Sequence, residues 1–534
     1  MKTIRRFILE KVLFLSLAFL ATIPMAYADT PQKGGDLKIL VYLYPPHFNP
    51  AIQSGIQVMI PGAQLFATLV RFDEKWQPLP YLAKSWKISG DRLTYTFPLA
   101  EKATFHDGKP ITSEDVAFSL EIMKKNHPFG ISMLGVVERV ETPDVHTAVV
   151  KLSKPHPALL QSLSLMPVIP KHVYGTEPIR NHPANLKPVG SGPFKFVEAK
   201  SGDYFIFERY DNFFRPSRPY LQRLIFKLVN DASAAEIAFR RGDVHYGSFS
   251  MGMRLQNITR LQKVDHLVIT RRGYEGIGPV VYLEINLRKK PFSDLRVRQA
   301  IAYSIDQDFI TQKLHQGFSV KSTGPLVHSN PFYSNDIQHY DLNLEKANKL
   351  LDEAGYPRKT DGTRFSATLD WSPGNYTDRQ IIAEYLKPQL RKIGIDIQLR
   401  PPPDFGTWAK WISTWNYDLT VNSFFGYGDP VIGVDRIFLC ENIKHILWSN
   451  TQGYCNPKVD EVLQKAAVEM DPEKRKSLYW EFQKLVARDL PLVFTHEPAF
   501  FTIYHRDLRN VPQGIWGAID PLDQTYWKDG KEPQ

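Results

Sequence analysis

The chain has 534 residues, 43% of them hydrophobic and 23% charged, with a formal net charge of +10. This length allows a sizeable buried core, divided among two to four domains of about 100 to 200 residues each. The basic clusters are short, and none forms the long basic stripe with interleaved aromatic residues that is typical of nucleic-acid binding, so we expect no nucleic-acid partner.

The N-terminal segment predicts export. Four basic residues precede an apolar run over 12–23, and the run closes on Ala26-Tyr27-Ala28. The run is shorter than the roughly 20 apolar residues of a membrane-spanning helix, and the small residues Ala26 and Ala28 are typical of a signal-peptidase site. We therefore predict a secretory signal peptide over 1–28, cut after Ala28. Because no cysteine lies near the cut, we expect release into a Gram-negative periplasm without a lipid anchor.

Strand-like and helix-like segments alternate along the rest of the chain. The alternating apolar residues of 93–97 and 204–207 predict strands. Thr112 and Asp115 have the spacing of a capping box at the start of a helix, and Asp294 is expected to cap another helix.

Further helix boundaries follow towards the C-terminus. Gly355 and Gly394 are expected to end two helices in the left-handed conformation that glycine tolerates. Asn456-Pro457 and Asp471-Pro472 each place a capping side chain before proline at the first helical position. We predict a mixed α/β protein whose domains are joined by several chain crossings, an arrangement that suits a hinge.

Two short motifs resemble catalytic sites but favour structural roles. Gly190-Ser191-Gly192 is followed at once by Pro193 and by no helix pattern, so it predicts a turn rather than a nucleophile elbow. Asp107-Gly108 is a turn former, and His106 beside it has no obvious partner set. Since none of the 15 histidines has a near neighbour of its own kind in the sequence, we expect no metal site, no cofactor and no enzymatic activity.

The only two cysteines are Cys440 and Cys455. In an oxidising compartment we expect them to form a disulfide, which the chain-entropy model values at roughly 3 kcal/mol for a loop of this size. Two unpaired thiols are the alternative.

A series of motifs along nearly the whole exported chain resembles family 5 of the extracellular solute-binding proteins, the dipeptide- and oligopeptide-binding components of ABC importers (cluster C). Single motifs are weak, but their order and spacing are specific. The motifs are Gly34-Gly35-Asp36-Leu37, Phe48-Asn49-Pro50, Leu82-Ala83-Lys84-Ser85-Trp86, Phe105-His106-Asp107-Gly108, Gly190-Ser191-Gly192-Pro193-Phe194, Pro291-Phe292-Ser293-Asp294, Val297-Arg298-Gln299-Ala300-Ile301, Leu350-Leu351-Asp352-Glu353-Ala354-Gly355-Tyr356, Tyr417-Asp418-Leu419 and Val459-Asp460.

The resemblance implies an α/β fold of the type II periplasmic-binding-protein class, with two lobes joined by a hinge and an extra α/β domain inserted in lobe one. Lobe one would be discontinuous, and the second lobe would enclose the ligand against it. The implied borders are 29–72, 190–285 and 503–534 for lobe one, 73–189 for the inserted domain, and 286–502 for lobe two.

The resemblance also implies candidate ligand-binding residues. Trp408 matches a tryptophan that lines the cleft of peptide-binding relatives; packing beside Trp411 and Trp415 is the alternative. In relatives, a carboxylate four residues before a proline pairs with the peptide's α-amino group, but here that position is Gly426. Asp429, directly before Pro430, is expected either to contact the ligand or to organise the turn.

Four aromatic residues complete the candidate site. Phe424 and Tyr427 lie in the segment that carries the amino-group carboxylate in relatives. Trp371 opens a Ser-Pro-Gly stretch after a strand and would form a second aromatic wall, and Tyr42 lies early in the first strand region.

The implied function is capture of a peptide or peptide-like solute by hinge closure, followed by delivery to an inner-membrane ABC permease with its ATPase subunits. The protein is expected to act as a monomer. A nickel chelate, an opine or an oligosaccharide is the alternative ligand. An exported hydrolase is a remote alternative, and a chaperone or signalling receptor built on the same fold is another.

Overall fold

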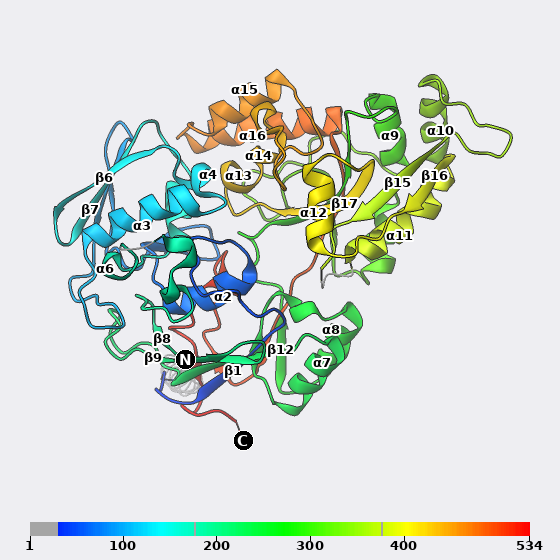
Figure 1. Ribbon diagram of the computed structural model, residues 1–534. Coiled ribbons are helices and arrows are strands. Elements are labelled where there is room, and N and C mark those ends of the chain that lie inside the picture. Colours follow the sequence, from blue (N-terminus) through cyan, green and yellow to red (C-terminus); the bar gives the residue numbers. More distant parts are fainter. Residues whose placement is uncertain (1–29, 176–177, 375–377, 534) are drawn as a thin grey trace, which may run out of the picture.

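The computed structural model describes residues 30–175, 178–374 and 378–533, so the predicted signal peptide lies outside the described residues. Two sheets organise the chain (Figure 1). The first has seven strands in the order β12-β19-β11-β1-β10-β9-β8, and the second has six in the order β14-β18-β13-β17-β15-β16. None of the helices formed by the described residues has both the length and the apolar character that a bilayer crossing requires.

The seven-stranded sheet belongs to lobe one. β1 and β10 pair in parallel with Ile39 opposite Phe226, and both side chains are buried in the large core of this half. The strands are β1 (Asp36–Val41), β8 (Phe194–Lys200), β9 (Tyr204–Arg209), β10 (Arg223–Leu228), β11 (Tyr246–Gly247), β12 (Leu267–Thr270) and β19 (Thr502–His505). The helices of this half are α2 (Ile56–Leu65), α7 (Ala232–Arg241), α8 (Leu255–Leu261) and the 3-10 turns η3 (Phe249–Gly252) and η6 (Gly517–Ile519). A short ribbon pairs β20 (Leu508–Arg509) with β21 (Tyr526–Trp527).

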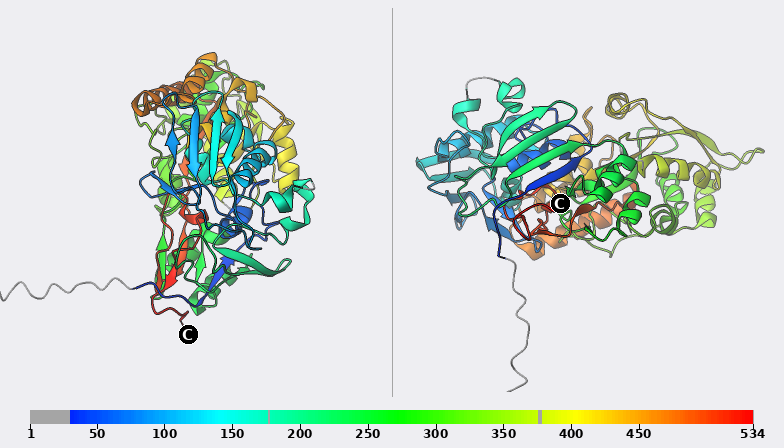
Figure 2. Two further views of the ribbon diagram at one scale, coloured as in Figure 1. Left: turned by 90° about the vertical axis from the view of Figure 1, so that its left-hand side faces the viewer. Right: turned by 90° about the horizontal axis from the view of Figure 1, so that it is seen from below.

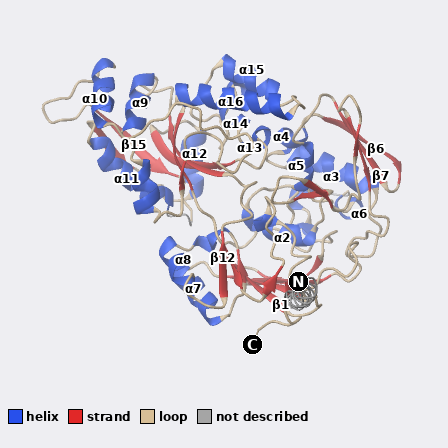
Figure 3. Cartoon of the chain, turned by 180° about the vertical axis from the view of Figure 1, so that it is seen from behind, coloured by secondary structure: helices blue, strands red, loops and turns tan. Residues whose placement is uncertain are grey.

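The six-stranded sheet forms lobe two. Figure 3 shows helices α9, α10 and α11 around β15, whereas α7 and α8 lie near β12 of the other lobe. The strands are β13 (Pro279–Ile285), β14 (Val320–Lys321), β15 (Phe365–Trp371), β16 (Ile395–Leu399), β17 (Leu419–Phe425) and β18 (Leu492–Glu497). The helices are α9 (Leu295–Tyr303), η4 (Phe309–Leu314), α10 (Leu344–Glu353), α11 (Asp378–Arg391), α12 (Phe405–Ser413), α13 (Pro430–Gly433), α14 (Asp435–Phe438), η5 (Cys440–Asn442), α15 (Pro457–Ala466) and α16 (Pro472–Asp489).

Strand β13 lies on the other side of the predicted lobe border. The sequence prediction ended the middle part of lobe one at residue 285, but β13 pairs with β17 on one edge and with β18 on the other. Every residue of β13 is buried, as expected of a central strand covered on both faces. The chain therefore enters the second sheet before β13, near Gly278.

The inserted segment builds its own sheet but shares the core of lobe one. Its four strands lie in the order β4-β5-β7-β6, on the side of the molecule far from α10 and α11 (Figures 1 and 2). Phe97 and Val150 of this sheet belong to the same buried cluster as Leu37 and Ile39 of β1. At the end of the first part of lobe one, β2 (Val70–Phe72) pairs with β3 (Pro78–Pro80) of the inserted segment. The other elements of the segment are β4 (Lys87–Ile88), β5 (Thr94–Pro98), β6 (Val137–Asp144), β7 (Thr147–Leu152), α3 (Ser113–Asn126), α4 (Gly130–Leu134), α5 (Leu159–Ser164), α6 (Lys171–Tyr174), η1 (Ile179–Asn181) and η2 (Pro183–Asn185).

The predicted helix boundaries and the disulfide are confirmed. The Asp115 carboxylate accepts the Thr112 backbone N–H at the start of α3, at 2.9 Å. Asn456 and Asp471 cap α15 and α16, each with proline in the first turn. Cys440 and Cys455 are joined by a disulfide.

The Gly190–Gly192 turn has a structural role. Ser191 is fully buried; its hydroxyl donates to the Val168 carbonyl at 2.7 Å and accepts the Ala67 N–H at 2.9 Å. His106 holds the same turn, because its Nδ1 accepts the Gly190 N–H and its Nε2 lies 3.0 Å from the Gly192 carbonyl. Both bonds form together only with a neutral ring, and burial lowers the pKa of His106 to about 4.

Acidification is expected to destabilise this turn. The unfolded chain binds a proton at the histidine below about pH 6.5, whereas the folded chain resists it down to about pH 4, so stability falls as the pH drops through that window. His106→Gln is expected to reduce the loss of Tm between pH 6.5 and 4.5 relative to wild type. Identical pH profiles of Tm, measured by circular dichroism, would contradict this role of His106.

Reduction is expected to lower stability without unfolding the protein at room temperature. The Cys440–Cys455 bridge closes a short loop. In the chain-entropy model, its loss lowers the free energy of unfolding by roughly 3 kcal/mol. Urea unfolding with and without dithiothreitol measures the difference. A Cys440→Ser/Cys455→Ser variant should show no further response to the reductant.

Candidate functional site

A cavity of about 390 Å³ lies between the two lobes. One wall comes from η3 and α8 of lobe one, the other from the end of η4 and the start of α11 in lobe two, and the floor from the segment that joins β18 to β19. The lining includes apolar, polar and charged side chains. Residues on it include Met253, Arg254, His315, Phe318, Asp378, Glu384 and Phe500.

Lobe two contributes a compact polar cluster to this wall. The two carboxylate oxygens of Asp378 face different histidines: Oδ1 lies 2.6 Å from His315 Nε2 and Oδ2 lies 3.0 Å from His496 Nε2. The two imidazole rings are 4.3 Å apart between centroids. The two histidines are distant in sequence, but the fold brings them together, because His315 follows η4 and His496 lies in β18.

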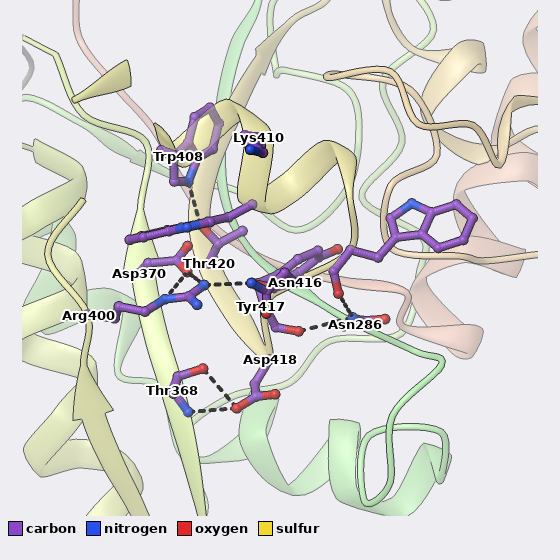
Figure 4. Close-up of polar contacts among 12 residues, drawn as sticks. Asn286, Thr368, Asp370, Arg400, Trp408, Lys410, Asn416, Tyr417, Asp418 and Thr420 are labelled. Carbon is purple, nitrogen blue, oxygen red and sulfur yellow. Dashed lines mark hydrogen bonds and ion pairs between the residues drawn. The ribbon is translucent and has the colours of Figure 1, made fainter. Parts of the chain in front are cut away.

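Trp408 lies in a packing cluster and not on the interlobe cavity. Its side chain is fully buried with Ile412 and Tyr417, and its Nε1–H donates to Thr420 Oγ1 at 3.1 Å (Figure 4). This placement favours the packing alternative, although the neighbours differ from those expected. Trp411 and Trp415 instead stack on arginines, with Arg400 and Arg288 at 4.0 and 3.8 Å from the respective ring centroids.

Asp429 organises its turn and forms a buried ion pair. Its side chain accepts the Val431 N–H at the start of α13, and its two oxygens lie 2.5 and 2.7 Å from Nη1 and Nη2 of Arg475. Asp429 and Arg475 are 3% and 5% exposed at the side chain, so the pair is shielded from solvent. Burial and the charge of Asp429 raise the pKa of nearby Asp435 well above its usual range, which leaves Arg475 paired with Asp429.

The aromatic residues around Asp429 link the lobes. The Phe424 side chain packs into the core of lobe two against Tyr282, with ring centroids 5.5 Å apart. Its neighbour Phe425 faces the opposite side of β17, towards Phe500 on the cavity, at 6.1 Å. Tyr427 packs against Phe129 of the inserted domain at 4.8 Å.

The two remaining candidates lie at strand ends. Trp371, the last residue of β15, is 8% exposed and belongs to the core of lobe two. Tyr42 follows β1, is 7% exposed and packs in a cluster with Phe239 and Phe501. Neither lines the interlobe cavity.

Sequence reasoning missed Arg475, His315, Asp378 and His496. Arg475 lies inside α16, 46 residues from its partner. The sequence of α16 is typical of an amphipathic helix with charged residues on its solvent-exposed face, so it does not distinguish a buried arginine. The cavity residues come from three separate elements of lobe two, so no local spacing marks them. Of these residues, only the partner of Asp429 could have been anticipated, because a carboxylate that becomes buried requires a counter-charge or hydrogen-bond donors.

Residues 77–445 match the family model described as bacterial extracellular solute-binding proteins, family 5 middle. The chain is 28% identical over 496 residues to the oligopeptide-binding protein AppA of Bacillus subtilis (strain 168), covering 88% of each chain.

Solved structures show the same fold. The structure of AppA from Bacillus subtilis in complex with a nonapeptide matches with a TM-score of 0.80 and 26% identity, over 93% of this chain and all of that one. NikZ from Campylobacter jejuni in complex with Ni(L-His) matches with a TM-score of 0.78 and 26% identity, over 92% of this chain and 96% of that one. The chain thus has the two-lobed type II fold.

Removing one partner of the buried pair is expected to be costly. Arg475→Met leaves the Asp429 carboxylate buried without its counter-charge, and such losses destabilise proteins by about 3–5 kcal/mol. Chemical denaturation measures the change in the free energy of unfolding. Lys125→Met, in the exposed Lys125–Glu121 pair, is the control and should leave the unfolding midpoint nearly unchanged. Equal stability of Arg475→Met and wild type would show that the pair has no structural role.

Proposed function

Because this chain belongs to the family 5 bacterial extracellular solute-binding proteins, we propose that it captures a peptide or peptide-like solute between its lobes and delivers it to an inner-membrane ABC permease with its ATPase subunits. The protein acts in the periplasm as a monomer, after removal of residues 1–28. It is a binding protein and not an enzyme.

The interlobe cavity is the observation that carries this proposal. It touches both lobes and the β18–β19 crossing, so a ligand bound there contacts the two bodies that hinge motion separates. A ligand shifts the equilibrium towards the closed form only by its higher affinity for that form. Simultaneous contact with both walls supplies that difference.

Recognition of the ligand's amino group departs from the pattern of peptide-binding relatives. Gly426 stands where the carboxylate is expected, and both oxygens of Asp429 are already paired with Arg475. An ammonium group buried without a counter-charge is costly. We therefore propose that the ligand has a blocked or differently placed amino group, or that it pairs with an acid of the cavity wall such as Glu384.

Among the six predicted ligand residues, Tyr427 is distinguished by its contact with the inserted domain. It belongs to lobe two and packs on the inserted domain, so it is placed to respond when the lobes move. All six side chains are buried, so ligand contact by any of them, Tyr427 included, requires a rearrangement.

The ligand is identified by native purification. The untagged protein is purified without denaturant, the small molecules released on unfolding are analysed by mass spectrometry, and thermal shifts are measured with peptide pools. A released peptide and a raised Tm with peptides support the proposal. A rise in Tm with sugars, opines or metal chelates alone would retain the transport role and overturn the ligand class. Cleavage of a peptide would instead indicate the hydrolase.

Phe318 tests whether the ligand occupies this cavity. Its ring projects from lobe two towards Phe501 of lobe one, at 5.3 Å between centroids, and is only partly buried. Phe318→Ala removes apolar surface worth about 1.5–3 kcal/mol when buried by a ligand, so we expect at least about tenfold weaker binding of the co-purified ligand. Phe405→Ala, which truncates an exposed phenylalanine outside the cavity, is the matched control. Equal calorimetric affinities of both variants and wild type would place the ligand elsewhere.

A further inference from the structure

The cluster of Asp378, His315 and His496 has the composition of a metal site. Among the described residues, these three form a group in which one possible ligand atom from each residue lies within 4.8 Å of the other two. All three residues belong to lobe two: His315 follows η4, Asp378 begins α11, and His496 lies in β18. Hinge motion therefore leaves the cluster intact.

The contacts of His496 direct one ring nitrogen at the carboxylate of Asp378. Thr495 has one hydroxyl hydrogen, which it donates to the Val281 carbonyl at 3.0 Å. Its oxygen therefore accepts the Nδ1–H of His496, also at 3.0 Å. The Nε2 atom of His496 lies 3.0 Å from Asp378 Oδ2. In the neutral ring with Nδ1 protonated, Nε2 carries a lone pair, so this contact is held by a cation: a second ring proton or a metal ion.

His315 has a buried ring nitrogen without a hydrogen-bond partner in the described part of the chain. Its Nε2 is buried and lies 2.6 Å from Asp378 Oδ1 without the geometry of a hydrogen bond. Its Nδ1 lies 2.8 Å from Ser319 Oγ, which fixes the ring orientation. Both imidazoles are thus held through Nδ1 by a hydroxyl, while Nε2 faces the carboxylate, which is the outer-sphere arrangement typical of metal-bound histidine.

We propose that His315, His496 and Asp378 bind a divalent transition-metal ion of the Zn²⁺ or Ni²⁺ class. Imidazole with one carboxylate suits these ions and disfavours Ca²⁺ and Mg²⁺, which require mainly oxygen ligands. Ligand atoms about 2.0–2.2 Å from a tetrahedral ion are about 3.3–3.6 Å apart, and one ligand atom from each of the three residues already lies within 4.8 Å of the others.

The ion would face the ligand cavity. His315 and Asp378 both line it, whereas His496 is fully buried behind them. Three protein ligands leave a fourth position of a tetrahedral ion open, and the cavity gives access to that position. A carboxylate or amine of the captured solute can occupy it, which supplies a charged anchor on a wall of the cavity. The metal site itself does not depend on the proposed peptide ligand.

The test uses the metal alone. Untagged protein is stripped with a chelator, dialysed and titrated with ZnCl₂ by calorimetry; one ion per chain is expected. His315→Gln and His496→Gln should each weaken binding at least about tenfold. His172→Gln is the matched control, because His172 pairs with Asp107 at 2.7 Å outside the cluster, and it should bind Zn²⁺ like wild type.

A spectroscopic measurement keeps the test independent of variant folding. Co²⁺ added to the stripped wild-type protein should give the intense visible bands of a low-symmetry tetrahedral site, and Zn²⁺ should displace them. Absence of these bands, no Zn²⁺ binding by wild type, or equal affinity in the two cluster variants and wild type would each overturn the proposal. Peptide-induced thermal shifts are a separate readout, so failure here leaves the proposed function standing.

Discussion

The structure depends on the chain passing between the two sheets at only two places in the described residues. The first passage joins β12 to β13 and the second joins β18 to β19. Each sheet has its own hydrogen bonds, and most buried residues pack within one lobe, although Tyr427 and Ile432 of lobe two belong to the large core of lobe one. Two neighbouring connections permit rotation of one lobe against the other, which separates contacts such as that of Tyr427 with Phe129. Changes within a lobe require breaking most of a packed core.

The polar interactions of each lobe reinforce this division. Asp429 and Arg475 join the end of β17 to α16, both within lobe two. In lobe one, His106 and Ser191 tie the inserted domain to the turn before β8. These groups are buried or half-buried and have hydrogen-bond partners within their own half, so they stabilise the internal structure of each lobe. A ligand in the interlobe cavity instead changes the free-energy difference between the open and closed arrangements of the lobes.

Local features could be predicted from the sequence, and long-range contacts could not. The caps at Asn456 and Asp471, the turn at Gly190–Gly192 and the disulfide follow from short-range chemistry and were confirmed. The side of β17 that faces lobe one was not predictable: Phe424 and Phe425 are equally apolar, and a shift of one residue reverses the face of a strand. The partner of Asp429 and the pairing of His315 with His496 required the fold, since no spacing relates them.

The central claim is that a ligand held between the lobes stabilises a closed form. Small-angle X-ray scattering of ligand-stripped protein, before and after addition of the co-purified solute, tests this most directly. We predict a smaller radius of gyration and a shorter maximum dimension with the solute bound. Identical scattering curves at saturating solute, starting from an open ligand-free form, would contradict it.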